Sequence, residues 1–238
     1  SDSAGNVYSN LPFKTGPSTS IFYNVKSTDY GNTWVADTAG QGKLGLSAGT
    51  QAMNFSVDQQ GTQFLVATGK LYAKRPGQAW RIDTTGLGLY PGELISDISL
   101  NNKKGVIYVS RLYFITSLNY VIYRRGIADT AWQIVNTSPL AVNQGRMISD
   151  QNGDLVVRTF TNPYKIWRYD GSTWTQATLP GAVGSPLILT VDRNGVLWGV
   201  FQALAGPNLG VYFSTNSGSN WTYVGLKGVG VKFLNWIG

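Results

Sequence analysis

Aromatic side chains stand beside basic side chains at three places in this chain. They are Tyr72 with Lys74 and Arg75, Tyr123 with Arg124 and Arg125, and Trp167 with Arg168. Aromatic rings stack on the C–H faces of sugar rings, while Arg and Lys donate hydrogen bonds to hydroxyl groups and carboxylates. Repeated along the chain, such pairs predict several weak sites whose avidity comes from multivalency. The predicted carbohydrate-binding residues are Tyr72, Arg75, Tyr123, Arg125, Trp167 and Arg168. The alternative is that the rings pack between sheets and the bases are solvated.

The residue types that are missing exclude several kinds of catalysis. The chain has no histidine and no cysteine, which excludes Ser-His-Asp triads, the common zinc sites and thiol nucleophiles. Paired carboxylates for glycoside cleavage remain, and they must lie about 5–10 Å apart. Glu93, the only glutamate, and Asp97 are four residues apart, so on a strand both would face one side, here a central channel. Alternatively, the two carboxylates flank the ends of the strand in solvent.

The charge of the chain favours anionic partners of a general kind. The net charge is +7, and the basic residues are dispersed except for three dibasic pairs, so there is no basic stripe typical of nucleic-acid binding. Acidic glycans or phosphate-rich lipopolysaccharide are the expected partners. No Asp-rich loop with calcium spacing is present, and no cofactor is expected. No apolar run is long enough to cross a membrane as a helix.

The elements that position these residues repeat along the chain. Five tryptophans lie roughly 40 to 50 residues apart, the length of a four-stranded propeller blade. They are Trp34, Trp80, Trp132, Trp174 and Trp221. Upstream of each stands a polar turn that ends in glycine, such as Asp58–Gly61, between two short apolar segments. Asn, Asp and Gly accept the positive φ that such hairpin turns require. Each unit therefore predicts four short strands, the last of which carries the tryptophan.

The two ends of the chain complement each other. The first unit lacks the strand that should precede its turn, Asp2–Gly5, and Lys232–Gly238 reads as a strand without a unit of its own. We therefore expect one domain, residues 1–238, folded as an all-β, five-bladed propeller of antiparallel four-stranded blades that the C-terminal strand closes. The expected units are 232–238 plus 1–50, 51–92, 93–144, 145–184 and 185–231.

The segment Ser27–Trp34 has the sequence STDYGNTW, which resembles the Asp-box hairpin found in the propellers of bacterial sialidases and many other proteins. A degenerate copy, STNSGSNW, spans Ser214–Trp221, and a shortened one spans Tyr169–Trp174. In such a box, the aspartate accepts hydrogen bonds from backbone amides, the glycine takes an unusual backbone angle and the tryptophan covers the hairpin. Asp29, Gly31 and the five tryptophans are therefore expected to build blades and not to bind a ligand.

The second and third units look more like tectonin-type lectin repeats, because an I/L-Y-x-R/K pattern precedes their tryptophans. Resemblance to sialidases would imply an arginine triad, a tyrosine nucleophile with a glutamate beside it and an acidic proton donor. No arginine of this chain can be matched to that triad. The resemblances thus imply a propeller without the catalytic set of sialidases, consistent with a protein that is not an enzyme.

Three functions remain, of which a multivalent, lectin-like carbohydrate-binding protein with sites between or on top of blades is the leading one. The others are a protein-interaction scaffold in a secreted or cell-envelope assembly and a glycoside hydrolase that uses channel carboxylates. Richness in Gly, Ser, Thr and Asn favours a secreted, periplasmic or extracellular location. The start at Ser1 without a methionine suggests a mature product whose leader has been removed or not included.

Overall fold

The computed structural model describes residues 1–14, 20–37, 39, 52–84, 86–87, 93–114, 118–135, 144–150, 152–159, 165–179, 183–192, 194–203 and 210–225. All regular secondary structure in these residues is β-strand. None of them belongs to a helix of the length and hydrophobicity that crossing a membrane requires.

The strands form five consecutive groups, which we call blades 1 to 5. Blade 1 contains β1 (Val7–Lys14), β2 (Ser20–Ser27) and β3 (Val35–Ala36). Blade 2 contains β4 (Ala52–Val57), β5 (Gln63–Ala67), β6 (Lys70–Lys74) and β7 (Arg81–Ile82). Blade 3 contains β8 (Leu94–Asn101), β9 (Val106–Phe114), β10 (Leu118–Gly126) and β11 (Gln133–Ile134). Blade 4 contains β12 (Gln144–Ser149), β13 (Leu155–Thr159), β14 (Ile166–Tyr169) and β15 (Trp174–Gln176). Blade 5 contains β16 (Val183–Val191), β17 (Leu197–Ala203), β18 (Gly210–Ser214) and β19 (Thr222–Gly225).

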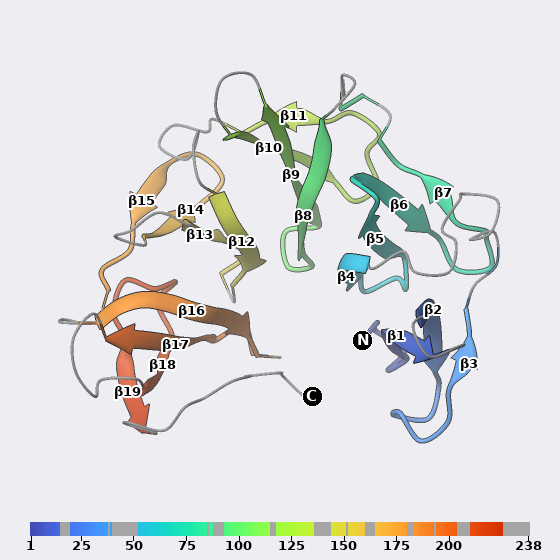
Figure 1. Ribbon diagram of the computed structural model, residues 1–238, viewed down its shortest axis with the longest axis horizontal. Coiled ribbons are helices and arrows are strands. Elements are labelled where there is room, and N and C mark those ends of the chain that lie inside the picture. Colours follow the sequence, from blue (N-terminus) through green and yellow to red (C-terminus); the bar gives the residue numbers. More distant parts are fainter. Residues whose placement is uncertain are drawn as a thin grey trace.

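Each blade is an antiparallel sheet whose neighbours follow chain order. The five sheets succeed one another around a common centre, with β4, β8, β12 and β16 innermost (Figure 1). These inner strands contact each other in sequence, and β1 contacts β4. The five-bladed propeller predicted from the sequence is therefore confirmed.

Blade 1 differs from the other blades in its strand count. Blades 2 to 5 each have four strands, whereas the described residues of blade 1 form three. The turn at Asp2–Gly5 precedes β1 as the turn at Asp58–Gly61 precedes β5, so the strand not found among the described residues is the innermost strand of blade 1. Lys232–Gly238, which we predict to supply it, lies outside the described residues, and closure of the ring stays a prediction.

The turns between the first and second strands share one architecture, in which an Asp or Asn side chain caps the turn. In blade 4, Oδ1 of Asp150 accepts hydrogen bonds from the amides of Asn152 and Asp154, both at 2.9 Å. The glycine that ends each of the five turns has a positive φ, between 62° and 80°. They are Gly5, Gly61, Gly105, Gly153 and Gly195. This repeated local chemistry explains why the turns could be found in the sequence.

Of the four buried apolar clusters in the described residues, three lie between blades and one is formed by residues of blade 2 alone. One buried cluster joins Phe64 and Leu71 of blade 2 to Ile95 and Ile107 of blade 3. Similar clusters join blade 3 to blade 4 and blade 4 to blade 5. Because both faces of an inner blade pack against neighbours, alternate residues of its strands are buried on both sides. Strands such as β5 are consequently buried along their whole length.

The outer hairpin of blade 1 has the hydrogen bonds of an Asp-box. Oδ1 of Asp29 accepts from the hydroxyl of Ser27 at 2.7 Å and from the amide of Thr33 at 2.8 Å. Oδ2 accepts from the Thr33 hydroxyl at 2.6 Å, and Nε1 of Trp34 donates to the carbonyl of Gly31 at 3.0 Å. The hydrogen bonds from Thr33 and Ser27 lower the pKa of Asp29 to about 2. Asp29 and Gly31, whose φ is 92°, thus shape the hairpin.

The two incomplete copies of the box keep part of this geometry. In blade 5, Oδ1 of Asn216 accepts from the Ser214 hydroxyl at 2.9 Å and from the amide of Asn220 at 2.8 Å. In blade 4, the Asp170 carboxylate accepts hydrogen bonds from the amides and hydroxyls of Ser172 and Thr173. The shared turn chemistry survives even where the sequence motif has degenerated.

Candidate functional site

One position, directly after the outer strand, links each blade to the next. At this position the backbone amide donates to a carbonyl of the strand that neighbours the outer strand in the same blade, over 2.7 to 2.9 Å. The residues are Asp37 in blade 1, Asp83 in blade 2, Val135 in blade 3 and Ala177 in blade 4. They occupy equivalent places, so differences among them show how each interface between blades is specialised.

At the first two interfaces the linking residue forms an ion pair with the next blade. Asp37 pairs with Lys74 at the end of β6, and Asp83 pairs with Arg125 near the end of β10. Lys74 and Arg125 lie three residues beyond the carbonyl that accepts the amide bond in their own blades, so they too are equivalent. The same device thus holds blade 1 to blade 2 and blade 2 to blade 3.

The third interface replaces the ion pair with apolar packing. There Val135 stands in place of the aspartate and Tyr169 in place of the base, and both belong to one buried apolar cluster. An apolar pair can therefore occupy this place in the same fold, as expected if well-packed apolar side chains match or exceed a buried ion pair in stability.

Arg125 is the most constrained of these bases. Its side chain is 7% exposed, and Nη2 is paired with the Asp83 carboxylate. Nη1 donates to the carbonyl of Asp129 at 2.9 Å, and the guanidinium lies 4.6 Å from the centroid of the Trp132 ring. Its Nε is buried and has no hydrogen-bond partner in the described structure. Burial lowers the pKa of Arg125, and the charge of Asp83 opposes that effect.

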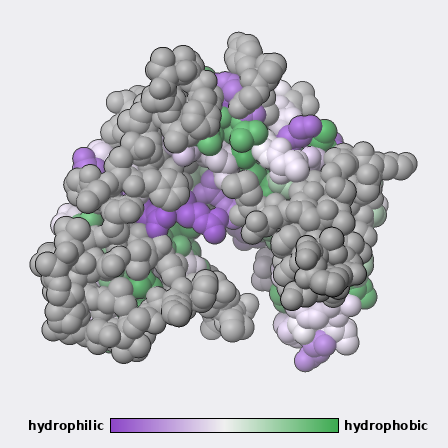
Figure 2. Space-filling view, viewed as in Figure 1, coloured by the Kyte–Doolittle hydropathy of each residue, from purple (hydrophilic) through white to green (hydrophobic). Residues whose placement is uncertain are grey.

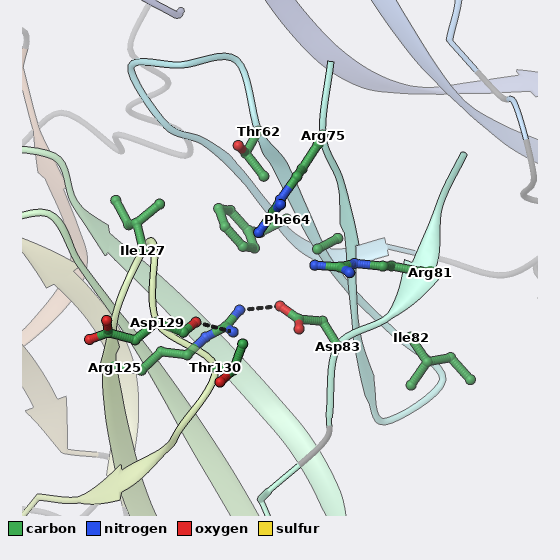
Figure 3. A pocket seen from close by; sticks show the side chains of 11 residues that line it. Thr62, Phe64, Arg75, Arg81, Ile82, Asp83, Arg125, Ile127, Asp129 and Thr130 are labelled. Carbon is green, nitrogen blue, oxygen red and sulfur yellow. Dashed lines mark hydrogen bonds and ion pairs between the residues drawn. The ribbon is translucent and has the colours of Figure 1, made fainter. Parts of the chain in front are cut away.

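Beside this ion pair lies a cleft of about 210 Å³ between blades 2 and 3 (Figure 3). Its walls combine three arginines, two carboxylates, threonine hydroxyls and apolar side chains. Blade 2 contributes Thr62, Phe64, Ala73, Arg75, Arg81, Ile82 and Asp83, and blade 3 contributes Arg125, Ile127, Asp129 and Thr130.

Positive charge exceeds negative charge inside this cleft. The side chains of Arg75 and Arg81 point into it toward Asp83 and Arg125, whereas the Asp129 carboxylate points away (Figure 3). Arg75 and Arg81 are exposed residues. Burial raises the pKa of Asp83, while the charges of Arg125, Arg81 and Arg75 oppose that rise. One carboxylate therefore faces three guanidinium groups.

Two of the six residues predicted from the sequence, Arg75 and Arg125, line this cleft. Their aromatic partners do not. Tyr72 is 1% exposed and Tyr123 is 6% exposed, so both rings are packed in the interior. Whether any of the six contacts a sugar stays a prediction; the structure assigns the two tyrosines packing contacts and Arg125 an ion pair between blades.

The remaining predicted pair lies in blade 4, at a junction of three blades. Nε of Arg168 forms an ion pair with Oδ2 of the buried Asp154 at 2.6 Å, and Trp167 packs against the cluster between blades 3 and 4. Oδ1 of Asp154 is paired with Lys104 of blade 3 at 3.0 Å, and Ser217 of blade 5 donates to Oδ2 at 3.5 Å. Asp154 thereby joins blades 3, 4 and 5, and Arg168 supports that junction.

The candidate catalytic carboxylates are both engaged by other groups. Glu93 lies 3.5 Å from Nη1 of Arg111, and its side chain is 10% exposed. Asp97 is buried, and its two oxygens accept the amides of Ile98 at 2.9 Å and of Met147 in blade 4 at 2.7 Å. Burial raises the pKa of Asp97 to about 6, against the hydrogen bond from Met147.

The strand that carries Asp97 is also irregular. β8 begins after Glu93, and its register against β9 shifts between Ile95 and Asp97. Because of this shift, alternation along the strand does not place the two carboxylates on one face, in contrast to the argument from the sequence.

Hydrophilic residues gather near β12, toward the centre of the propeller (Figure 2). The described part of the chain contains no group of three metal-ligating side chains.

Comparison with known proteins identifies the fold. No family model matches the sequence, and no curated protein matches it. Among solved structures, TolB from Acinetobacter baumannii has a TM-score of 0.63 and 11% identity over 94% of this chain and 53% of that chain. An oligogalacturonate lyase in complex with manganese has a TM-score of 0.63 and 9% identity over 92% and 62%. A streptogramin B lyase has a TM-score of 0.57 and 14% identity over 92% and 72%. The chain spans between half and two thirds of the first two, and at these identities the comparisons show a shared β-propeller fold.

Proposed function

We propose that this protein binds carbohydrate without transforming it, and that the cleft between blades 2 and 3 is its binding site. The observation that carries the proposal is the composition of the cleft. Ile82 and Ile127 provide apolar surface for the C–H faces of a sugar, while Thr62, Thr130 and the arginines provide hydrogen bonds. Concave sites with apolar walls and a few convergent polar groups are typical of small-molecule binding.

A single site of this kind fits the structure better than a repeated one. The positions equivalent to Arg81, two residues before the linking position, hold Val35 in blade 1, Gln133 in blade 3 and Thr175 in blade 4. Of the four blades compared, only blade 2 therefore has an arginine at this position. We accordingly propose one carbohydrate site in the cleft and leave multivalency out of the proposal.

Binding is favoured over catalysis because the two candidate carboxylates already have partners. A general acid or nucleophile needs access to the glycosidic bond, but both oxygens of Asp97 accept backbone amides and Glu93 is paired with Arg111. If the purified protein cleaves chromogenic glycosides and Glu93→Gln or Asp97→Asn abolishes the cleavage, the hydrolase alternative replaces binding.

An array of neutral and acidic glycans tests the proposal. We expect binding that is lost in Thr130→Trp, because an indole at this exposed, cleft-lining position fills the mouth of the cleft. Ala131→Trp is the matched control, because Ala131 is also exposed but does not line the cleft. A blank array, together with recovery of a stoichiometric protein partner in pull-down, would favour the scaffold alternative.

A further inference from the structure

We propose that the cleft selects a sugar that carries a carboxylate, and that Arg75 and Arg81 hold this group; the inference rests on carbohydrate binding at the cleft. The two arginines belong to one hairpin of blade 2. Arg75 directly follows β6, and Arg81 begins β7, where it pairs with Ala73 of β6. Their guanidinium groups therefore converge from one side, while Arg125 enters from blade 3 on the other (Figure 3).

Arg75 and Arg81 are not needed to hold blade 2 against blade 3. The preceding interface is held by the equivalent ion pair, Asp37 with Lys74, and the residue equivalent to Arg81 there is Val35. One acid and one base thus suffice to join two blades. At the cleft, the Asp83 carboxylate is already paired with Arg125. Within the described residues, neither Arg75 nor Arg81 has an ion-pair partner.

The two extra arginines instead create a local excess of positive charge. Like charges repel, and the repulsion grows where the surroundings are partly desolvated. Their influence reaches both members of the ion pair, since Arg81 and Arg75 shift the pKa of Asp83 and that of Arg125 downward. Arg125, which lines the cleft, also has a buried Nε without a hydrogen-bond partner among the described residues. An anion that enters the cleft relieves this repulsion.

A carboxylate on a single sugar ring fits this arrangement in shape and size. The planar guanidinium binds a carboxylate through two parallel hydrogen bonds, which fixes orientation as well as charge. Pockets for drug-sized ligands measure about 300–1,000 Å³, whereas this cleft measures about 210 Å³. We therefore infer recognition of one acidic residue, such as the terminal residue of a glycan.

Calorimetric titration with two matched probes tests the inference. The methyl glycosides of galacturonic acid and of galactose differ only at C6, which is a carboxylate in the first and a hydroxymethyl group in the second. We expect the acid to bind at least about tenfold more tightly, and binding to weaken between about 0.1 M and about 1 M sodium chloride, as the Debye length falls from ~10 to ~3 Å. Arg75→Gln and Arg81→Gln should each weaken binding of the acid about tenfold or more, toward the affinity for the neutral sugar.

Lys70→Gln is the charge-matched control, because Lys70 is exposed at the opposite end of β6 and does not line the cleft. It should leave both affinities unchanged. If the two sugars bind equally and the arginine variants have no effect, the carboxylate inference is wrong but carbohydrate binding stands. If only a short aspartate peptide binds, in a manner that depends on Arg75 and Arg81, the anion site serves a protein partner. If none of these probes binds, the carboxylate inference fails, and carbohydrate binding fails with it if the glycan array is also blank.

Discussion

The ion pair between Asp83 and Arg125 can be tested against the apolar pair at the next interface. Asp83→Val removes the carboxylate from Arg125, whose side chain is 7% exposed. Truncating one member of a buried pair costs about 3–5 kcal/mol, because the other charge stays buried. The Asp129 carbonyl and the Trp132 ring still contact the guanidinium. We therefore expect a loss near the lower limit, about 3 kcal/mol in the free energy of unfolding.

The double variant should recover most of this loss. Asp83→Val with Arg125→Tyr reproduces the pair formed by Val135 and Tyr169 at the equivalent place between blades 3 and 4. Arg125→Tyr alone leaves Asp83 with Arg81 and Arg75 nearby, so its cost should be smaller, about 1–2 kcal/mol. Since apolar pairs can match buried ion pairs, we expect the double variant to lie within about 1 kcal/mol of the original protein.

Urea unfolding of the four proteins, followed by circular dichroism at neutral pH, supplies the double-mutant cycle. The expected interaction energy between the two positions is about 3–5 kcal/mol, the sum of the two single losses less the loss of the double variant, at or above the upper end of the range for residues in contact. An interaction energy near zero, or a cost below about 1 kcal/mol for Asp83→Val, would refute the reasoning. It would show that the pair does not join the blades energetically.

The remaining predictions concern other parts of the fold. The pKa of Asp97 is about 6 in the folded protein against 3.8 for the ordinary group. The contribution of Asp97 to stability is therefore present below about pH 4 and is lost as pH rises through 6, by at most on the order of 3 kcal/mol. Urea midpoints measured across this pH range should show the loss in the original protein but not in Asp97→Asn. For Asp29 the sign is opposite, since its pKa falls to about 2; the hydrogen bonds of its hairpin should weaken as pH falls from about 4 toward 2, measured by amide exchange against Asp29→Ala. Gly153→Ala should cost more than Gly105→Ala in urea midpoint, since both have positive φ but only at Gly153 would the added Cβ meet a neighbouring side chain, at 2.9 Å. Deletion of 232–238 should unfold the protein, seen as loss of the far-ultraviolet circular dichroism signal, if this segment completes blade 1; a folded truncated protein would contradict ring closure.

The fold could be predicted because its signals are local. Each capped turn, such as Asp150 to Gly153, and each outer hairpin, such as Ser27 to Trp34, is determined by residues within one short segment. The spacing of these turns and hairpins along the chain then gives the number of blades. Even in the sequence, the turn of the first unit stands without a strand before it, and the described residues of blade 1 likewise include no innermost strand.

The candidate site could be predicted only in part, because it is assembled from two blades. Alternation along a strand shows which residues share a face of the sheet. Because neighbouring blades cover both faces, alternation could not show that Tyr72 and Tyr123 are buried. Arg81 was missed because it follows a marker tryptophan in a strand assigned a structural role. A useful signal was present: an aspartate three residues after the tryptophan in units 1 and 2, with a base in the next unit.

The arginine side chains themselves report most directly on the acidic-sugar site. Their Nε–Hε signals in nuclear magnetic resonance spectra can be assigned with the Arg75→Gln and Arg81→Gln variants and followed during titration with methyl galacturonide. We predict that the signals of Arg75 and Arg81 shift together and saturate, while that of Arg168, held by Asp154 in blade 4, does not move. Saturating shifts confined to other arginines, or no shift at all, would contradict the assignment of the cleft as the binding site.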